Sequence, residues 1–127
     1  MPHLDVYTLD SDLTGREDTL IDGLTSAVAA VYGEWARPSV VVRLIGLPAG
    51  RWGIGGRPAA APAPSVTFGI RGDALDRPDA AAILSGLAAS VTDAIVTVLG
   101  ERHRDGTTVE FVPQRPDRIA VGGKLGG

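Results

Sequence analysis

Two six-residue segments of the chain are alike, and this repetition limits the possible folds more than any other feature. Residues 51–56 read RWGIGG and residues 118–123 read RIAVGG. They share the arginine, a β-branched fourth residue and a pair of glycines. Each segment lies near the end of one half of the chain. We therefore expect one structural unit to occur twice.

The residues upstream of each segment repeat the same order of elements. Residues 4–9 and 65–71 alternate as strands do. Behind each run, apolar residues recur at helical spacing, and a glycine then predicts the helix end. The apolar positions are Leu20, Leu24, Val28 and Val31 before Gly33, and Ile83, Leu87, Val91, Ile95 and Val98 before Gly100. Both halves thus begin with a strand and a helix.

The helix starts are predicted from different signals. Thr14 and Glu17 have the spacing of a capping box, in which a threonine accepts a hydrogen bond from the backbone three residues on. Pro78 suits the first turn of the second helix, where a proline loses no hydrogen bond. Second strands are then expected over residues 39–47 and 107–112.

Each half is therefore a βαβ unit, whose strands run parallel through a right-handed crossover. We predict an α+β fold in which tandem βαβ repeats form a four-stranded sheet with two helices on one face. Residues 1–127 are expected to form one domain, with halves at about 2–56 and 64–123 joined by the Pro/Ala-rich linker 57–64. Neither half, at about sixty residues, would bury much surface alone.

The face of the sheet without helices also needs a cover. Val40, Val42 and Leu44 form an apolar set that we place on a central strand. Apolar surface of this kind favours association with further copies of the chain. We expect a homo-oligomer.

Composition excludes several classes of function. The net charge of −3 and a pI near 5.2 give no reason to expect binding to nucleic acid or to an anionic membrane. There is no cysteine, and the two histidines have no ligand spacing, so no metal site is expected. Residues 80–99 approach the length of a membrane span. However, a polar stripe at Ser85, Ala89, Asp93 and Thr97 indicates a helix lying on a sheet. With no signal peptide apparent, we expect a cytoplasmic protein.

Several of these segments together resemble the tautomerase superfamily. They are MP at the start, LTGRE at 13–17, SVVVRLIGLP at 39–48 and WGIGG at 52–56. The chain is most similar to 4-oxalocrotonate tautomerase and to relatives in which two short subunits are fused. The resemblance implies the tautomerase/MIF-like fold and a homotrimer of fused chains. It also implies a catalytic amino-terminal proline that is exposed when methionine is removed.

That implied role falls on Pro2. A general base works best when its pKa is close to the working pH. A free α-amino group begins at about 7.7–8.0, and an apolar pocket with neighbouring arginines lowers the value further. Pro64 matches Pro2 in the second half, but its nitrogen is a tertiary amide and cannot act as a base. We therefore expect one active site per chain.

The resemblance also implies substrate-binding residues. Arg71 ends the first strand of the second half, where fused members hold substrate carboxylates. Arg43 lies two residues after the aligned position of the family's strand arginine, and on the same face. Trp52 matches an aromatic residue that would keep the amine dry. The family's arginine before the first helix aligns near Asp12 and is missing.

The function implied is enol–keto proton transfer on a small unsaturated 2-hydroxy or 2-oxo carboxylic acid, without cofactor. One alternative keeps Pro2 but performs dehalogenation by hydration, or decarboxylation, with Glu110 activating water. Another is a non-catalytic trimeric binding protein whose amine is blocked by a retained Met1. The residues leave these alternatives open.

Overall fold

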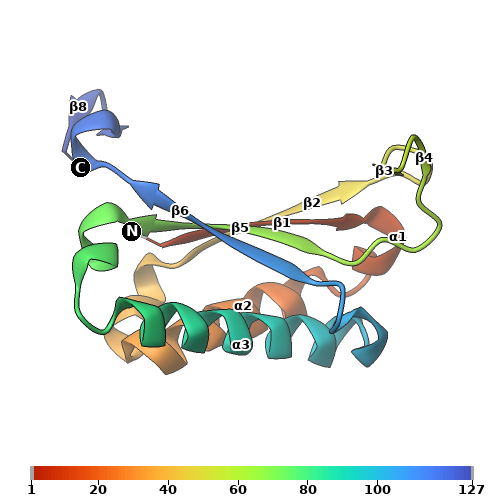
Figure 1. The fold of residues 1–127 in the computed structure, drawn as a ribbon, viewed down its shortest axis with the longest axis horizontal. Helices are drawn as coiled ribbons and strands as arrows, with labels where there is room; N and C mark the ends of the chain where they lie inside the picture. Colours follow the sequence, from red (N-terminus) through yellow and green to blue (C-terminus); the bar gives the residue numbers. More distant parts are fainter. Residues whose placement is uncertain (1, 127) are drawn as a thin grey trace.

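The fold is built from one main sheet, two long helices and two small hairpins (Figure 1). The computed structural model describes residues 2–126, and Met1, on which exposure of the amine depends, lies outside them. The strands of the main sheet are β1 (His3–Leu9), β2 (Val41–Leu47), β5 (Ser65–Arg71) and β6 (Thr108–Gln114). The helices are α1 (Asp10–Leu13), α2 (Glu17–Tyr32) and α3 (Ala80–Leu99), and the hairpin strands are β3 (Gly53–Ile54), β4 (Arg57–Pro58), β7 (Ala120–Val121) and β8 (Lys124–Leu125). Short 3₁₀ segments lie at Glu34–Ser39, Gly72–Asp76, Glu101–His103 and Pro116–Arg118.

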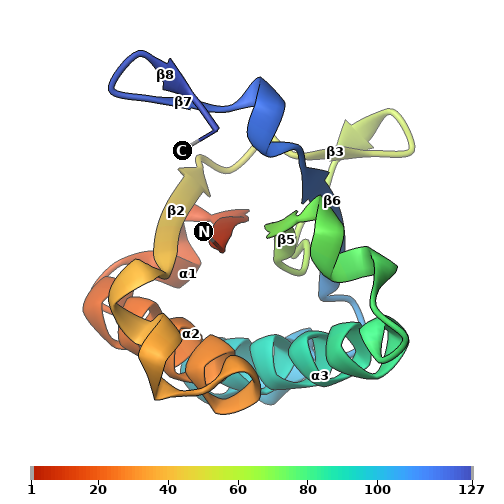
Figure 2. The same cartoon turned by 90° about the vertical axis from the view of Figure 1, so that its left-hand side faces the viewer.

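The sheet order is β2-β1-β5-β6. β1 pairs in parallel with β2, and β5 pairs in parallel with β6. β1 and β5 run antiparallel at the centre, with Val6 opposite Val66. α2 and α3 lie side by side across one face (Figure 2). The predicted α+β fold class, with four strands and two helices on one face, is confirmed.

The core lies between the helices and the sheet. Phe68 is fully buried on β5, and its ring centroid lies 5.3 Å from that of Phe111 on β6. α2 and α3 approach closely where Gly23 faces Ala94, and Ser90 Oγ donates to the Ala27 carbonyl oxygen at 3.0 Å. The other fully or nearly fully buried core residues include Leu4, Val6, Leu20, Leu24, Val28, Val66, Leu87, Val91 and Ile95. The burial follows the predicted apolar stripes.

α3 has the length and composition of a membrane span, but it packs against α2 in this fold. Its bounds agree with the apolar stretch noted in the sequence. Ser85, Ala89, Asp93 and Thr97 are all exposed, as the polar stripe predicted. Gly100 ends the helix with φ 121°, and Gly33 ends α2 with φ 117°.

One prediction about the open face of the sheet is wrong. β2 is an edge strand, and Val40, Val42 and Leu44 pack against the core on the helix side. Strand alternation instead places Tyr7 and Val112 on the open face, where each is 39% exposed. The apolar set on β2 therefore needs no further copy of the chain to cover it.

The predicted capping box is also absent. Thr14 Oγ1 donates to the Asp10 carbonyl oxygen at 3.1 Å and so serves the short helix α1. α2 begins at Glu17 without a side-chain cap. Because the Thr14 hydroxyl is hydrogen-bonded to α1, it does not cap the start of α2. Pro78 lies just ahead of α3, which begins at Ala80.

The repeated glycine pairs form the turns of the two hairpins. Gly55 and Gly56 have φ of 63° and 82° between β3 and β4, and Gly122 and Gly123 have φ of 59° and 80° between β7 and β8. Two consecutive positive φ values are what a tight two-residue hairpin requires. Arg57 and Pro58 pair in the first hairpin, so the connection between the halves begins with a strand. The two hairpins stand at opposite ends of the sheet (Figure 1).

Candidate active site

Equivalent backbone hydrogen bonds hold the two prolines that precede β1 and β5. The Val41 N–H donates to the Pro2 carbonyl oxygen at 3.1 Å, and the Thr108 N–H donates to the Pro64 carbonyl oxygen at 3.2 Å. Pro64 is fully buried, whereas Pro2 is only partly buried. The fold thus repeats the backbone position but gives only Pro2 a route to a ligand.

Pro2 lies in the wall of a cavity of about 600 Å³ between the end of α2 and the end of β5. The cavity is lined by Pro2, Tyr32, Trp35, Ala36, Ser39, Ile70, Arg71, Asp73, Ala74 and Arg77. Six of these ten side chains are apolar or aromatic. Because β1 and β5 are antiparallel, the start of β1 and the end of β5 meet here. The structure therefore brings Pro2 and Arg71 together, although they are far apart in the sequence.

Two arginines stand on this wall, each beside an aspartate of its own. Arg71 Nε lies 3.3 Å from Asp73 Oδ1, and Arg77 Nε lies 3.0 Å from Asp79 Oδ1. The Arg71 side chain is 60% exposed and that of Arg77 is 58% exposed. Exposed pairs of this kind are weak. Either guanidinium is thus free to exchange its aspartate for a substrate carboxylate.

Arg43 belongs to a second hollow on the open face of the sheet. This hollow, of about 230 Å³, is lined by His3, Val41, Arg43, Arg71, Gln114, Pro116, Ile119 and Val121. Arg43 Nε lies 2.6 Å from Asp5 Oδ1, and His3 Nδ1 lies 2.7 Å from Gln114 Nε2. Arg71 borders both hollows, so Arg43 shares the second hollow with Arg71 but does not line the Pro2 cavity.

Trp52 is placed at the other end of the sheet. It lines a third hollow, of about 280 Å³, with Tyr7, Leu47, Arg51, Gly53 and Ser65. Its counterpart in the second half, Ile119, lies in the hollow beside Arg71. A single chain therefore does not bring Trp52 to Pro2. A role for Trp52 at the proline requires a neighbouring copy.

Two aromatic residues in the Pro2 cavity were not identified from the sequence. Tyr32 ends α2, and Trp35 follows within the next 3₁₀ turn. Trp35 is 76% exposed, yet its Nε1–H donates to the Tyr32 carbonyl oxygen at 2.9 Å. The two ring centroids are 6.4 Å apart. The sequence does contain a sign of this pair. The chain has only two tyrosines and two tryptophans, and one of each, Tyr32 and Trp35, are three residues apart.

Gly33 allows this arrangement. A Cβ at residue 33 would lie 2.8 Å from Cδ1 and Nε1 of Trp35. Such a contact is too short, and φ at residue 33 is 117°. The glycine that ends α2 therefore also lets the Trp35 ring lie back over the helix end.

Burial raises the pKa of the Tyr32 phenol, and the positive charge of Arg77 partly opposes that rise. A phenol with a raised pKa keeps its proton at neutral pH. The cavity thus offers a protonated hydroxyl and two guanidinium groups.

Asp12, where the resemblance led us to expect an arginine, takes part in a structural cluster at the far end of the sheet. Its carboxylate lies 3.0 Å from Arg102 Nη2 and 3.6 Å from His103 Nε2. The His103 ring is buried, and burial lowers its pKa. A carboxylate at this position cannot bind an anionic substrate.

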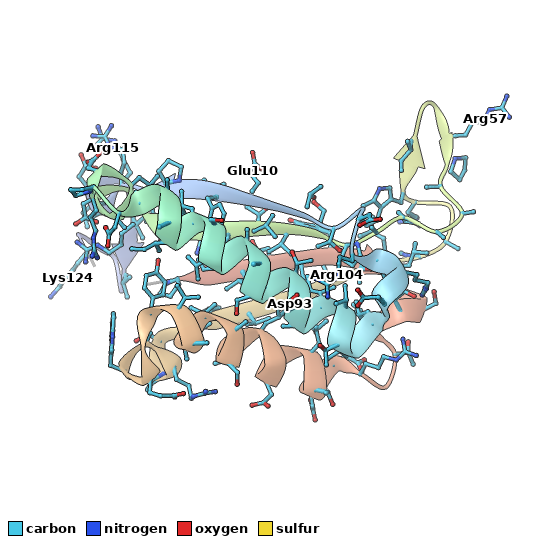
Figure 3. All side chains as sticks on the ribbon, turned by 60° about the horizontal axis from the view of Figure 1, so that its bottom comes forward. Arg57, Asp93, Arg104, Glu110, Arg115 and Lys124 are labelled. Carbon is cyan, nitrogen blue, oxygen red and sulfur yellow. The ribbon has the colours of Figure 1, made fainter. Side chains whose placement is uncertain are left out.

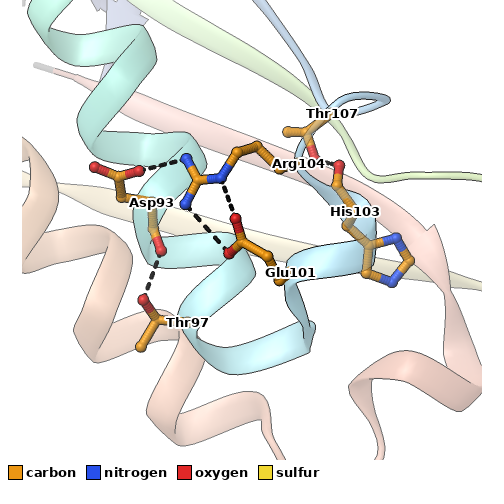
Figure 4. Close-up of polar contacts among 6 residues, drawn as sticks. All are labelled: Asp93, Thr97, Glu101, His103, Arg104 and Thr107. Carbon is orange, nitrogen blue, oxygen red and sulfur yellow. Dashed lines mark hydrogen bonds and ion pairs between the residues drawn. The ribbon is translucent and has the colours of Figure 1, made fainter.

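A second set of ion pairs fixes the turn after α3 (Figure 4). Arg104 Nη1 donates to Asp93 Oδ1 at 2.6 Å, and Arg104 Nε donates to Glu101 Oε1. These contacts raise the pKa of Arg104 and lower that of Glu101. The cluster joins α3 to the segment that leads into β6, away from the Pro2 cavity.

Glu110 lies on β6 opposite Thr67 and is exposed (Figure 3). It is not part of the lining of the Pro2 cavity. Among residues 2–126, no group of three or more acidic or histidine side chains is placed to hold a metal ion. The polar side chains that line the Pro2 cavity are those of Tyr32, Trp35, Ser39, Arg71, Asp73 and Arg77.

No protein-family model matches the sequence, and no curated protein matches it. Solved structures match the fold over almost its whole length. A wild-type fused 4-OT that forms an asymmetric trimer is 27% identical, with a TM-score of 0.81, covering 98% of this chain and 95% of that one. A native fused 4-OT is 25% identical over the same shares, also with a TM-score of 0.81.

More distant structures share the fold. A member of the cis-3-chloroacrylic acid dehalogenase family, called N1, is 22% identical, with a TM-score of 0.76, and covers 97% of this chain and 82% of that one. The expected likeness to a fused member of the tautomerase superfamily is confirmed, and so is the 4-OT- and MIF-like fold.

Proposed function

We propose that this chain, which has the structure of a fused tautomerase-superfamily member, is a cofactor-independent tautomerase with Pro2 as its general base. The observation that carries the proposal is that Pro2 and Arg71 line one largely apolar cavity. The substrate class proposed is a small unsaturated 2-hydroxy or 2-oxo carboxylic acid.

Each part of the cavity has a role in this reaction. Once Met1 is removed, Pro2 has a secondary amine. Apolar neighbours such as Ile70 and Ala74 disfavour its protonated form, and so does the charge of Arg71. Arg71 binds the substrate carboxylate through its planar guanidinium. An amine that is unprotonated near neutral pH then takes and returns one proton.

The geometry supports one site per chain. Pro64 repeats the backbone position of Pro2, but it is fully buried and its nitrogen is an amide. The second half therefore supplies Arg71 and part of the wall rather than a second base.

We propose further that the active form is a cytoplasmic homotrimer. Two fused 4-OT structures similar to this chain are trimers. The open face of the sheet carries Tyr7 and Val112, and both hairpins carry exposed apolar residues. Within one chain neither Trp52 nor Arg43 lines the Pro2 cavity, so a role for Trp52 at Pro2 would need a neighbouring copy, whereas Arg43 lies in the hollow that it shares with Arg71.

Hydration or decarboxylation is the less favoured reaction. Dehalogenation by hydration needs a group that activates water, and Glu110, the residue expected to do so, stands on the open face of β6 outside the Pro2 cavity. A binding protein without catalysis would require that Met1 remain in place.

Two measurements test the proposal. Intact mass spectrometry of the purified protein should show a chain that begins at Pro2. Ketonisation of phenylenolpyruvate and of 2-hydroxymuconate should be followed for the wild type and for Pro2→Ala. We expect the substitution to remove most of the activity. Equal rates in the two proteins, or a retained Met1, would rule out Pro2 as the base.

A further inference from the structure

We propose that the Tyr32 hydroxyl donates a hydrogen bond to the oxygen on C2 of the substrate, and that Tyr32 is thereby a catalytic residue acting with Pro2. This inference rests on the proposed function, because it assigns a further group to the same reaction.

The fold brings Tyr32 and Pro2 to one cavity. α2 returns across the sheet between β1 and β2, so its last residue lies at the end of the sheet where β1 begins. Tyr32 and Pro2 both line the cavity, together with Ile70 and Ala74. The Tyr32 side chain packs partly against the core, which limits where its hydroxyl can lie.

The position of the Tyr32 ring is constrained on one side by Trp35. The Trp35 Nε1–H bonds to the backbone oxygen of Tyr32 at 2.9 Å, and the two rings are tilted by 57° with centroids 6.4 Å apart. Gly33, between them, has no side chain to push the indole away. A donor that is held in place before the substrate arrives loses little entropy in the reaction.

Within residues 2–126 the Tyr32 hydroxyl takes part in no side-chain hydrogen bond, so it is available as a donor to a ligand. The charged groups that line the same cavity are Arg71, Asp73 and Arg77. Burial keeps the pKa of Tyr32 above its ordinary value in spite of Arg77. The hydroxyl therefore carries its proton and can donate it in a hydrogen bond.

The chemistry needs such a donor. During ketonisation, the Pro2 nitrogen takes the proton from the enol hydroxyl, and the released O–H electron pair stays on the C2 oxygen as an enolate. That pair then forms the C2 carbonyl bond as the π pair of the C2=C3 bond takes the proton back from the prolinium onto C3. Negative charge gathers on the C2 oxygen during this transfer. Tyr32 stabilises that charge and keeps its own proton throughout.

A donor of this kind acts mainly in the transition state, so its loss should lower kcat and change KM little. Tyr32→Phe removes the hydroxyl and keeps the ring. We expect kcat for phenylenolpyruvate to fall about 10²-fold, the loss typical for one oxyanion donor. Tyr7→Phe is the matched control, because Tyr7 is the other tyrosine and lines the hollow at the far end of the sheet.

The test separates this inference from the proposed function. If Pro2→Ala abolishes turnover while Tyr32→Phe turns over like Tyr7→Phe, the role of Tyr32 is refuted and the proline mechanism stands. If Tyr32→Phe raises KM alone, the hydroxyl binds only the ground state, and the proposal is again refuted. If Pro2→Ala keeps the wild-type rate, the proposed function itself fails, and the role of Tyr32 fails with it. Circular dichroism and thermal melting should show that all three variants are folded.

Discussion

Trp52 and Ile119 occupy equivalent positions in the two halves, yet they lie at opposite ends of the sheet. Ile119 borders the hollow next to Arg71, and Trp52 borders the hollow next to Tyr7. The reason is that the two central strands are antiparallel, so matching points of the halves are carried to opposite ends. The tryptophan that lines the Pro2 cavity of a chain is therefore Trp35.

This placement predicts which tryptophan reports on ligand binding. Phenylpyruvate should quench the indole fluorescence of Trp52→Phe, which retains Trp35. It should quench that of Trp35→Phe much less, because the remaining indole is remote from the cavity of its own chain. Fluorescence titration of the two variants measures this. The reverse pattern would show that a neighbouring copy brings Trp52 to the bound ligand.

Arg71 should carry more of the binding of the carboxylate than any exposed arginine elsewhere. We expect Arg71→Gln to raise KM for phenylenolpyruvate by a factor that corresponds to about 1.5–3 kcal/mol, typical for a hydrogen bond to a charged group. Arg57→Gln is the control, because Arg57 stands at the tip of the distant hairpin (Figure 3). Steady-state kinetics decide between them, and an unchanged KM for Arg71→Gln would contradict the assignment.

The stability of the protein should depend on pH through His103. Burial holds the folded pKa of His103 below its ordinary 6.5, with Arg102 acting in the same direction. Below pH 6.5 the unfolded chain therefore binds a proton more readily than the folded chain. The stability that this residue contributes is present above pH 6.5 and is lost as the pH falls through its folded pKa.

Urea unfolding at pH 8 and pH 5.5 measures this effect. The free energy of unfolding should fall more between these pH values for the wild type than for His103→Gln, which cannot titrate. Equal falls in both proteins would show that Asp12 compensates the imidazolium, since the two side chains lie 3.6 Å apart.

Gly33→Ala should destabilise the fold and disturb the Trp35 side chain. The substitution places a Cβ 2.8 Å from the indole, at a backbone φ of 117°. We expect the free energy of unfolding to fall by about 1–3 kcal/mol, which is the cost of holding a side chain in a rarely populated backbone conformation. Gly50→Ala is the control, since φ there is 89° but nothing lies within 4 Å of the added atom. Only the Gly33 variant should also change the tryptophan fluorescence of the native protein.

Of the substitutions predicted here, Phe68→Ala should lower the free energy of unfolding the most. Phe68 is fully buried on a central strand and contacts the Phe111 ring. Truncating a buried phenylalanine costs about 3–5 kcal/mol. Denaturant unfolding measures the loss, and a change below about 1 kcal/mol would mean that the core closes around the gap.

Most of the fold could be predicted from the sequence because the information is local. Strand alternation, the helical stripes and the terminating glycines each depend on neighbours a few residues away. The repeated glycine pairs predicted two like segments, and both are tight hairpins. The capping box failed because a competing turn, α1, uses Thr14. The prediction that β2 is a central strand was wrong, because the periodicity of a strand does not indicate whether it lies at the edge of the sheet.

The sequence by itself determined two βαβ units, a proline ahead of each, and an arginine at the end of β5. Only the tertiary structure decided which of these groups meet. Antiparallel pairing of β1 with β5 places Pro2 and Arg71 in one cavity and leaves Trp52 at the opposite end of the sheet. The return of α2 across the sheet adds Tyr32 and Trp35 to the same cavity. Such contacts depend on the direction and order of strands distant in the chain, which local side-chain patterns do not specify.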